Sequence, residues 1–422
     1  MLSFKINDYN ITTNKKGSNE YSKVSYPIRF GTYSIIETPE YIYHFNLNGC
    51  IKLIQSKDKN WPQDEWIKRT EGNDWIYYTP GIYTGLFSYI GEYYLPCFSY
   101  RSNSIFAFDP FVNNSVENAI KSLDSISVKA LNLLNNNIPE ELNEFLNLVA
   151  SNNLNNLKLK SKQLHDIIGG LITVLPPDSR HVDYDVIPIT IADGCKYKCK
   201  FCIVKNRLPF KLRSKNNILN QIRKLKDFYG GNISNYNSVY LGQHDALGAG
   251  EELTLFAAEK SYETFELNRS SMNGANLFLF ASIDSFLNAK NDLFQSLNKT
   301  PFYTYINIGL ESADNDTLEI LRKPVSVQSV HSAFIKMMEV NKQYDKVEVT
   351  ANFILSNELP DGHYPSIVDL VNRVCSKKYS KGGIYLSPLY NSRNGNIELQ
   401  KKFIEIKNKI PIPAYIYLIQ RL

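Results

Sequence analysis

Cysteine, methionine, tryptophan and histidine are all scarce in this chain of 422 residues, which contains 6, 4, 3 and 6 of them. Six cysteines in a chain of this length do not make the disulfide framework of a small secreted protein. Three of the six fall between positions 195 and 202. This clustering indicates metal ligation in a reducing compartment.

Long hydrophobic runs are also lacking. The longest apolar stretch, 167–175, is interrupted by Gly169 and Gly170 and is far shorter than the roughly 20 residues that a membrane span needs. The first residues turn polar at once, so we expect no signal peptide. These absences predict a soluble, cytoplasmic protein with no membrane span.

Charge of either sign is not in strong excess. The formal net charge is +5, from 47 basic and 42 acidic residues, and this weak bias neither requires nor excludes a nucleic acid partner. The apolar fraction of 43% and the charged fraction of 21% are typical of globular proteins. The length predicts two domains, or one large barrel with an added module.

Residues 1–177 are predicted to form an N-terminal accessory domain of α+β type. Residues 1–110 alternate short β-branched and aromatic runs with turn signals, which is typical of strands. Residues 113–175 change to a helical spacing of apolar side chains. The aromatic side chains are expected to form either an ordinary β core or an apolar lid over the second domain. The first residues to consider for these two roles are His44, Trp61, Trp66, Tyr77 and Tyr78.

Residues 178–410 alternate strands and helices, and residues 411–422 are expected to be a C-terminal extension. The expected strands are 186–191, 238–241, 277–283, 303–310, 347–355 and 383–386. The expected helices are 214–228, 251–265, 285–298, 326–341, 364–377 and 396–408. This order implies an α/β fold with parallel strands and right-handed crossovers. A doubly wound sheet and a partial barrel share the pattern, and periodicity alone does not choose between them.

Cys195, Cys199 and Cys202 follow the first of these strands in a Cys-x3-Cys-x2-Cys spacing. Three thiolates on one short loop can hold three irons of a cubane 4Fe–4S cluster and leave the fourth iron open. The loop lies at the carboxyl edge of the strands, where strand–helix folds place their chemistry. The alternatives are a zinc site, which lacks a fourth ligand nearby, a two-cysteine redox motif and buried cysteines without a ligand.

The same motif, with the aromatic Phe201 just before its last cysteine, resembles the radical S-adenosylmethionine (SAM) superfamily. The resemblance covers about residues 184–400 and implies a partial (β/α)6 TIM-like barrel with the cluster loop after its first strand. It also implies two cofactors, a 4Fe–4S cluster and SAM, which is cleaved to a 5′-deoxyadenosyl radical. Phe201 is then expected beside the adenine.

The segment after the second strand lies where the family often has a Gly-Gly-Glu-like turn that receives the SAM amino group. This chain has Gly242, Gln243, His244 and Asp245 there, without a second glycine. A glycine lets the backbone approach a ligand closely, so Gly242, Gln243 and Asp245 are expected to bind SAM. His244 is the candidate catalytic residue, because a histidine there can donate a proton or contact the substrate.

The fourth strand ends in Gly309-Leu310-Glu311-Ser312. This segment is similar to the Gly-Leu-Glu-Ser segment of the branch that contains the elongator, methylthiotransferase and oxygen-independent coproporphyrinogen enzymes. Core packing explains such a carboxylate poorly, so Glu311 and Ser312 are expected to contact SAM at its ammonium or ribose. Arg322 or Lys323 is placed to meet the SAM carboxylate. Two further polar residues are expected near the ribose or adenine, Ser282 and Asn352.

Together these features predict an oxygen-sensitive enzyme with one cluster, which abstracts a hydrogen from a small-molecule substrate. Its electron donor is expected to be a protein such as flavodoxin or ferredoxin. Cys50, Cys97 and Cys375 are too scattered for a second cluster, and Val204 stands where the coproporphyrinogen-type enzymes usually have a further cysteine. The alternatives are radical modification of RNA or a peptide, and a non-enzymatic iron–sulfur binding protein.

Overall fold

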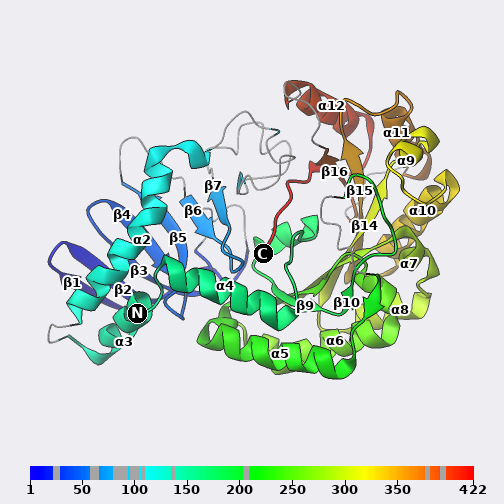
Figure 1. Ribbon diagram of the computed structural model, residues 1–422. Helices are drawn as coiled ribbons and strands as arrows, with labels where there is room; N and C mark the ends of the chain where they lie inside the picture. The colour runs from blue at the N-terminus through cyan, green and yellow to red at the C-terminus, as the bar shows by residue number, and fades with distance from the viewer. Residues whose placement is uncertain are drawn as a thin grey trace.

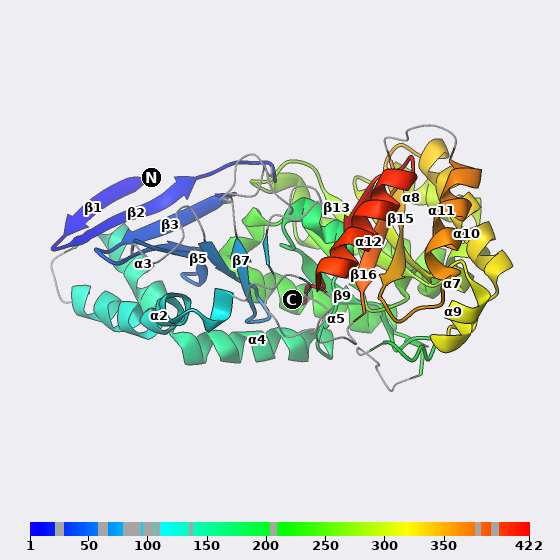
Figure 2. The ribbon, with the colours of Figure 1, turned by 90° about the horizontal axis from the view of Figure 1, so that it is seen from above.

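The computed structural model describes residues 1–21, 29–57, 66–78, 94–95, 105, 110–134, 138–202, 209–375, 381–389 and 396–422. Trp61, Cys97 and Val204, which entered the sequence analysis, lie outside these ranges. The described chain has two parts that lie side by side, an antiparallel sheet with helices against it and a curved parallel sheet (Figures 1 and 2).

The N-terminal sheet has eight strands, each paired with the next one in the sequence. The strands are β1 (Leu2–Ile6), β2 (Tyr9–Lys16), β3 (Thr32–Glu37), β4 (Tyr41–Phe45), β5 (Ile51–Ser56), β6 (Trp66–Arg69), β7 (Trp75–Tyr78) and β8 (Tyr94–Leu95). Three helices follow, α2 (Asn114–Leu133), α3 (Glu140–Ala150) and α4 (Leu154–Ile168). Apolar residues of α2 such as Val116 and Leu123 are buried, and the Tyr43 hydroxyl lies 2.8 Å from that of Ser122. One sheet face is therefore covered by helix, as the expected α+β domain requires.

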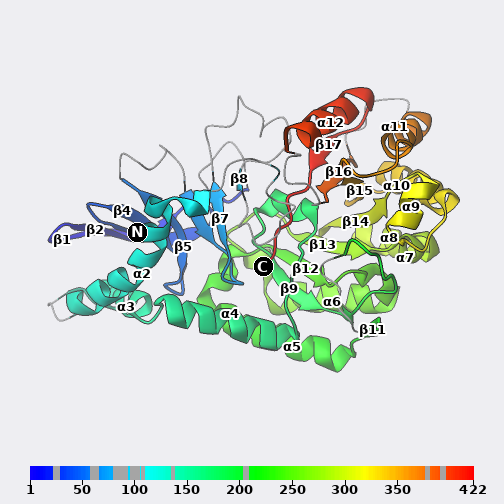
Figure 3. The same ribbon diagram turned by 45° about the horizontal axis from the view of Figure 1, so that its top comes forward.

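The second part is a parallel sheet of seven strands in the order β17-β16-β15-β14-β13-β12-β9. The strands are β9 (Ile187–Thr190), β12 (Ser238–Gly242), β13 (Asn276–Ala281), β14 (Tyr303–Glu311), β15 (Val347–Leu355), β16 (Ile384–Pro388) and β17 (Ala414–Ile416). A doubly wound sheet reverses its strand order at a switch point. Here the order follows the sequence throughout, so the sheet curves as a partial barrel (Figure 3).

All six predicted strands are present, and β17 adds a seventh that pairs with β16. The connecting helices are α5 (Lys215–Tyr229), α6 (Glu251–Thr264), α7 (Ile283–Asn288), α8 (Asn291–Lys299), α9 (Asn315–Ile320), α10 (Val327–Gln343), α11 (His363–Val374) and α12 (Asn396–Lys409). The single helix expected at 285–298 is two helices, because Ala289 and Lys290 both have extended backbone. Since β17 belongs to the sheet, the predicted boundary at residue 410 falls between two paired strands.

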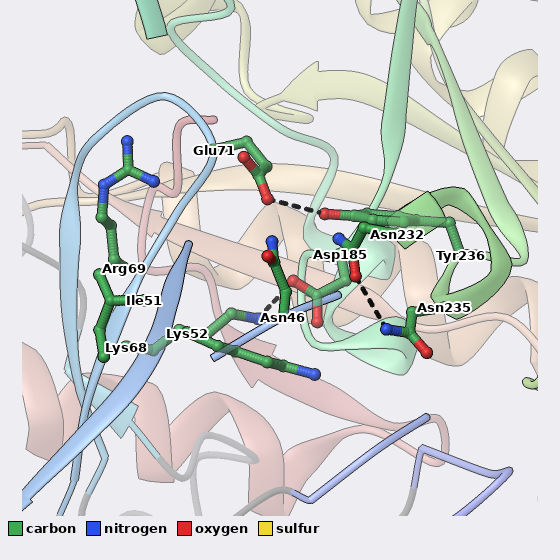
Figure 4. Close-up of a pocket in the computed structure, with 10 residues that line it drawn as sticks. All are labelled: Asn46, Ile51, Lys52, Lys68, Arg69, Glu71, Asp185, Asn232, Asn235 and Tyr236. Atoms are coloured by element: carbon green, nitrogen blue, oxygen red, sulfur yellow. Dashed lines mark hydrogen bonds and ion pairs between the residues drawn. The ribbon is translucent and has the colours of Figure 1, made fainter. Parts of the chain in front are cut away.

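One joint between the two parts lies at the amino edge of the parallel strands. A cavity of about 30 Å³ lies there between the N-terminal sheet and the segments before β9 and β12 (Figure 4). The Lys68 ammonium lies 3.0 Å from Asp183 and 2.6 Å from Asp185. The Tyr78 hydroxyl donates to Asp183 at 2.7 Å, and the Tyr236 hydroxyl donates to Glu71 at 3.1 Å. The joint is therefore polar and closely paired.

The position of this joint helps to decide whether the aromatic side chains of the N-terminal part form a β core or a lid over the second part. Lys68 and Tyr78 of the N-terminal sheet contact residues that precede β9, whereas the cysteine loop follows β9 at the opposite edge. Trp66, Tyr77 and Tyr78 are each about 1% exposed, and His44 is buried against Trp66 at a ring-centroid distance of 4.9 Å. These described side chains therefore form an ordinary β core and do not cover the barrel mouth.

No helix of the described chain combines the length and apolar character required to cross a membrane.

Replacing Lys68, which pairs with Asp183 and Asp185, tests how much this joint stabilises the protein. Lys68→Met removes the buried cation between Asp183 and Asp185, so we expect the free energy of unfolding to fall by about 3–5 kcal/mol. The matched control is Lys121→Met, which breaks an exposed pair with Glu117 on α2 and should change it by at most about 0.5 kcal/mol. Chemical unfolding measures both free energies. If Lys68→Met lowers the free energy of unfolding no more than Lys121→Met does, the buried cation adds no stability to the joint.

Candidate functional site

The cysteine loop begins and ends at a short two-stranded ladder. Its strands, β10 (Ala192–Asp193) and β11 (Lys211–Leu212), pair antiparallel directly after β9. Arg213 donates to both carboxylate oxygens of Asp193, at 2.6 and 2.9 Å, and its backbone N–H donates to Ile191. A bidentate pair of this kind is geometrically specific. It anchors the base of the loop at the carboxyl edge of the sheet.

Cys195, Cys199 and Cys202 are all free thiols in this loop. Cys199 is buried, whereas Cys195 and Cys202 are half-buried. Burial raises the pKa of Cys195 and of Cys199, and the positive charge of Lys323 opposes the shift at both thiols. A thiol must lose its proton to bind iron. The nearby cation therefore favours the thiolate form that a cluster needs.

Two hydrogen bonds join the loop to the ends of neighbouring strands. The Lys200 N–H donates to the Leu321 carbonyl at 2.9 Å, and the Asp284 N–H donates to the Tyr197 hydroxyl at 3.2 Å. The Lys323 ammonium lies 5.2 Å from the centre of the Tyr197 ring. These contacts bring the cysteines to the residues that follow β13 and β14.

Glu311 and Lys323 form a buried ion pair beside the loop, with 3.2 Å between Nζ and Oε1. Their side chains are only 12% and 4% exposed. Lys323 also donates to the Gly309 carbonyl at 2.7 Å. A Cβ on Gly309 would lie 2.5 Å from the Glu311 carboxylate, so the glycine leaves room for the pair. Glu311 itself has a φ of 68°, in the left-handed region that non-glycine residues rarely adopt.

Asp245 connects the ends of β12 and β13. Its carboxylate accepts hydrogen bonds from the Ser282 N–H and hydroxyl, both at 2.9 Å, and from the Ser285 hydroxyl at 2.5 Å. The Tyr240 hydroxyl donates to the Gln243 carbonyl at 2.7 Å. The segment predicted to bind SAM is therefore held by its own polar contacts. A role for Gly242, Gln243, Asp245 and Ser282 as SAM contacts stays a prediction.

His244 lies at this same edge and is half-buried. Burial lowers its pKa below the usual value, so the imidazole is neutral at pH 7. Its ring makes no hydrogen bond within the described part of the chain. A neutral imidazole with both nitrogens available can donate one hydrogen bond and accept another.

The other predicted site residues have different surroundings. The Ser312 hydroxyl lies 2.8 Å from Nδ1 of His363, and the Asn352 amide donates to Asn307 at 2.7 Å. Phe201 is half-buried. Arg322 is exposed, whereas Lys323, the other residue considered for the SAM carboxylate, is buried against Glu311. The structure thus places Lys323 rather than Arg322 beside the loop.

The donor set of the loop, three free thiols, is the set that a cubane cluster with one open iron takes. No three His, Cys, Asp or Glu side chains among the described residues are arranged to hold one metal ion. In a cubane, each thiolate binds a different iron, so three sulfurs surround the cluster without converging on one point. This loop supplies three free thiols, with the Lys323 ammonium nearby. Cys195, Cys199 and Cys202 are therefore the residues that would hold the cluster.

Comparison with known proteins identifies the second part of the chain. The family model described as the Radical SAM superfamily matches residues 189–371. The curated proteins give no match. Among solved structures, the cobalamin-dependent SAM radical enzyme OxsB, with aqua-cobalamin and SAM bound, has 16% identity and a TM-score of 0.33. SuiB of Streptococcus suis has 12% identity and a TM-score of 0.36.

The matched lengths differ between the two structures. The OxsB match covers 53% of this chain and 30% of OxsB, so the chain spans less than a third of that protein. The SuiB match covers 90% of this chain and 72% of SuiB. Residues 189–371, which contain the cysteine loop and the Glu311–Lys323 pair, are a domain of the radical SAM superfamily, a family that uses a 4Fe–4S cluster and SAM.

Proposed function

We propose that this protein is a radical SAM enzyme that abstracts a hydrogen atom from a small-molecule substrate. The observation that carries the proposal is the position of the cysteine loop, whose Lys200 N–H contacts Leu321, two residues before Lys323. Cys195, Cys199 and Cys202 would hold the cluster. When bound, the 4Fe–4S cluster supplies the electron that cleaves SAM to methionine and a 5′-deoxyadenosyl radical.

The Glu311–Lys323 pair is proposed to bind the amino acid end of SAM. That end carries an ammonium and a carboxylate, so it is a zwitterion. A buried pair of opposite charges complements a zwitterion without leaving a net charge in the interior. Glu311 is expected to accept hydrogen bonds from the ammonium, and Lys323 to donate to the carboxylate.

His244 is proposed to contact the substrate. It lies on the segment after β12, at the carboxyl edge where the cysteine loop also lies, and its ring nitrogens have no partner in the described chain. Since burial lowers its pKa, the ring is held in the neutral form, which can donate one hydrogen bond to a substrate and accept another. Asn352 and Phe201 are proposed as ribose or adenine contacts.

The exposed lysines of the loop favour an acidic electron donor. Lys196, Lys198 and Lys200 alternate with the cysteine and tyrosine positions, are all exposed, and form no ion pair with any described residue. A flavodoxin or ferredoxin with acidic groups around its redox centre would be oriented by the opposite charges, with the two redox centres close together.

SAM cleavage is the direct test of the function. Anaerobically reconstituted protein with dithionite and SAM should release 5′-deoxyadenosine and methionine, and Cys199→Ala should abolish this release because one iron loses its ligand. The control is Cys375→Ala, a buried cysteine at the end of α11, which should keep the wild-type rate. Protein that binds zinc, or that holds a cluster and never consumes SAM, would refute the enzyme and leave an iron–sulfur binding protein.

Gly309→Ala tests the ion pair without removing a charge. The new Cβ would press on the Glu311 carboxylate, so we expect the affinity for SAM to fall about tenfold, in line with the loss of about one charged hydrogen bond. Gly231→Ala is the control, because its nearest contact would be an ordinary 3.9 Å. Equilibrium dialysis against labelled SAM measures both. Equal affinities would show that Glu311 does not bind SAM.

Charge reversal tests the electron donor surface. The double variant Lys196→Glu, Lys198→Glu should slow reduction by flavodoxin about tenfold at low salt and less at high salt. Lys158→Glu, Lys162→Glu on the exposed face of α4 should not slow it. Stopped-flow spectroscopy gives both rates, and a loss that is independent of salt would contradict electrostatic docking.

A further inference from the structure

His363 is a fully buried histidine on the far side of Ser312 from the cysteine loop's own motif in the sequence. It is the first residue of α11, directly after the turn that follows β15, and it has no exposed surface. Burial lowers its pKa to about 4, so the ring is neutral at physiological pH. A buried imidazole of this kind must satisfy both of its nitrogens within the protein.

The hydrogen bonds determine which nitrogen carries the proton. Nε2 lies 2.8 Å from the Ile354 carbonyl, which can only accept, so Nε2 is the donor. Nδ1 must then accept, and its partner at 2.8 Å is the Ser312 hydroxyl, which donates. The same hydroxyl oxygen accepts the Asp314 N–H at 3.1 Å. An ordered chain of bonds therefore runs from β15 through His363 to Ser312.

The chain ends at the residues that hold the site. Ser312 directly follows Glu311, whose φ of 68° needs support from its surroundings. Asp314 accepts from the Thr317 N–H at 2.9 Å and so begins α9, the helix that leads to Leu321 and Lys323. Glu311 ends β14 directly before Ser312, and Lys323 follows the helix that Asp314 begins directly after it, so both members of the ion pair are attached to this point.

We infer that His363 is a positioning residue that, through Ser312, holds Glu311 in the orientation that pairs with Lys323 and receives the zwitterionic end of SAM. The inference rests on the proposed function. His363 does not touch SAM itself, since its two nitrogens bind Ile354 and Ser312. Its effect is on the affinity for a ligand that carries an ammonium and a carboxylate.

The first test compares two substitutions. His363→Phe removes both hydrogen bonds and should raise the Kd for SAM about tenfold, measured by equilibrium dialysis on the reconstituted protein. His363→Gln keeps one donor and one acceptor on a side chain of similar reach, and should recover the affinity to within about threefold. His331→Phe on α10 is the control, because His331 makes no hydrogen bond in the described chain.

A double-mutant cycle then separates positioning from general stability. Ser312→Ala should raise the Kd for SAM as His363→Phe does, and the two together should cost no more than either alone, because both break the same bond. Iron content and the thermal midpoint are recorded for each variant. A lower midpoint with an unchanged Kd would show a purely structural role and overturn the inference.

A second readout uses the protein without its cofactors. Nitrogen NMR of labelled histidine should show His363 with its proton on Nε2 from pH 6 to 8, and the opposite tautomer would overturn the inference. Wild-type protein that never binds SAM would instead refute the proposed function. His363→Phe that binds SAM as tightly as wild type would refute only the role of His363.

Discussion

The ion pair between Glu311 and Lys323 is the interaction around which the site is built. A buried pair gains little stability, because the cost of removing two charges from water roughly cancels their attraction. Here the pair also needs a glycine at position 309 and a left-handed conformation at Glu311. We propose that a zwitterionic ligand, rather than packing, accounts for this arrangement. In the proposed function the adjacent thiols would hold the cluster, so the zwitterion would bind beside it.

The two edges of the parallel sheet have separate tasks. At the amino edge, Lys68, Asp183 and Tyr78 join the N-terminal sheet to the barrel with short, buried contacts. At the carboxyl edge, the polar groups belong to the loops after β9, β12, β13 and β14. Stability and chemistry therefore depend on different residues, and substitutions at one edge need not disturb the other.

The sequence predicted what depends on local pattern and missed what depends on distant partners. The six strands and the cysteine loop follow from β-branched runs and from spacing. The pattern of strands and helices could not distinguish a barrel from a doubly wound sheet, and only the strand order of the structure decided between them. Lys323 rather than Arg322 pairs with Glu311 in the site. Arg322, the residue before it, has a left-handed φ of 51°, which the residue types alone did not predict. His363 carries no local signal, because its partner Ser312 is 51 residues away.

A crystal structure of the reconstituted protein with SAM tests the central claim most directly. The account predicts that the SAM ammonium lies within hydrogen-bond distance of the Glu311 carboxylate and the SAM carboxylate within reach of the Lys323 ammonium, with Cys195, Cys199 and Cys202 on three irons. SAM bound elsewhere, with Glu311 and Lys323 still paired only to each other, would contradict it.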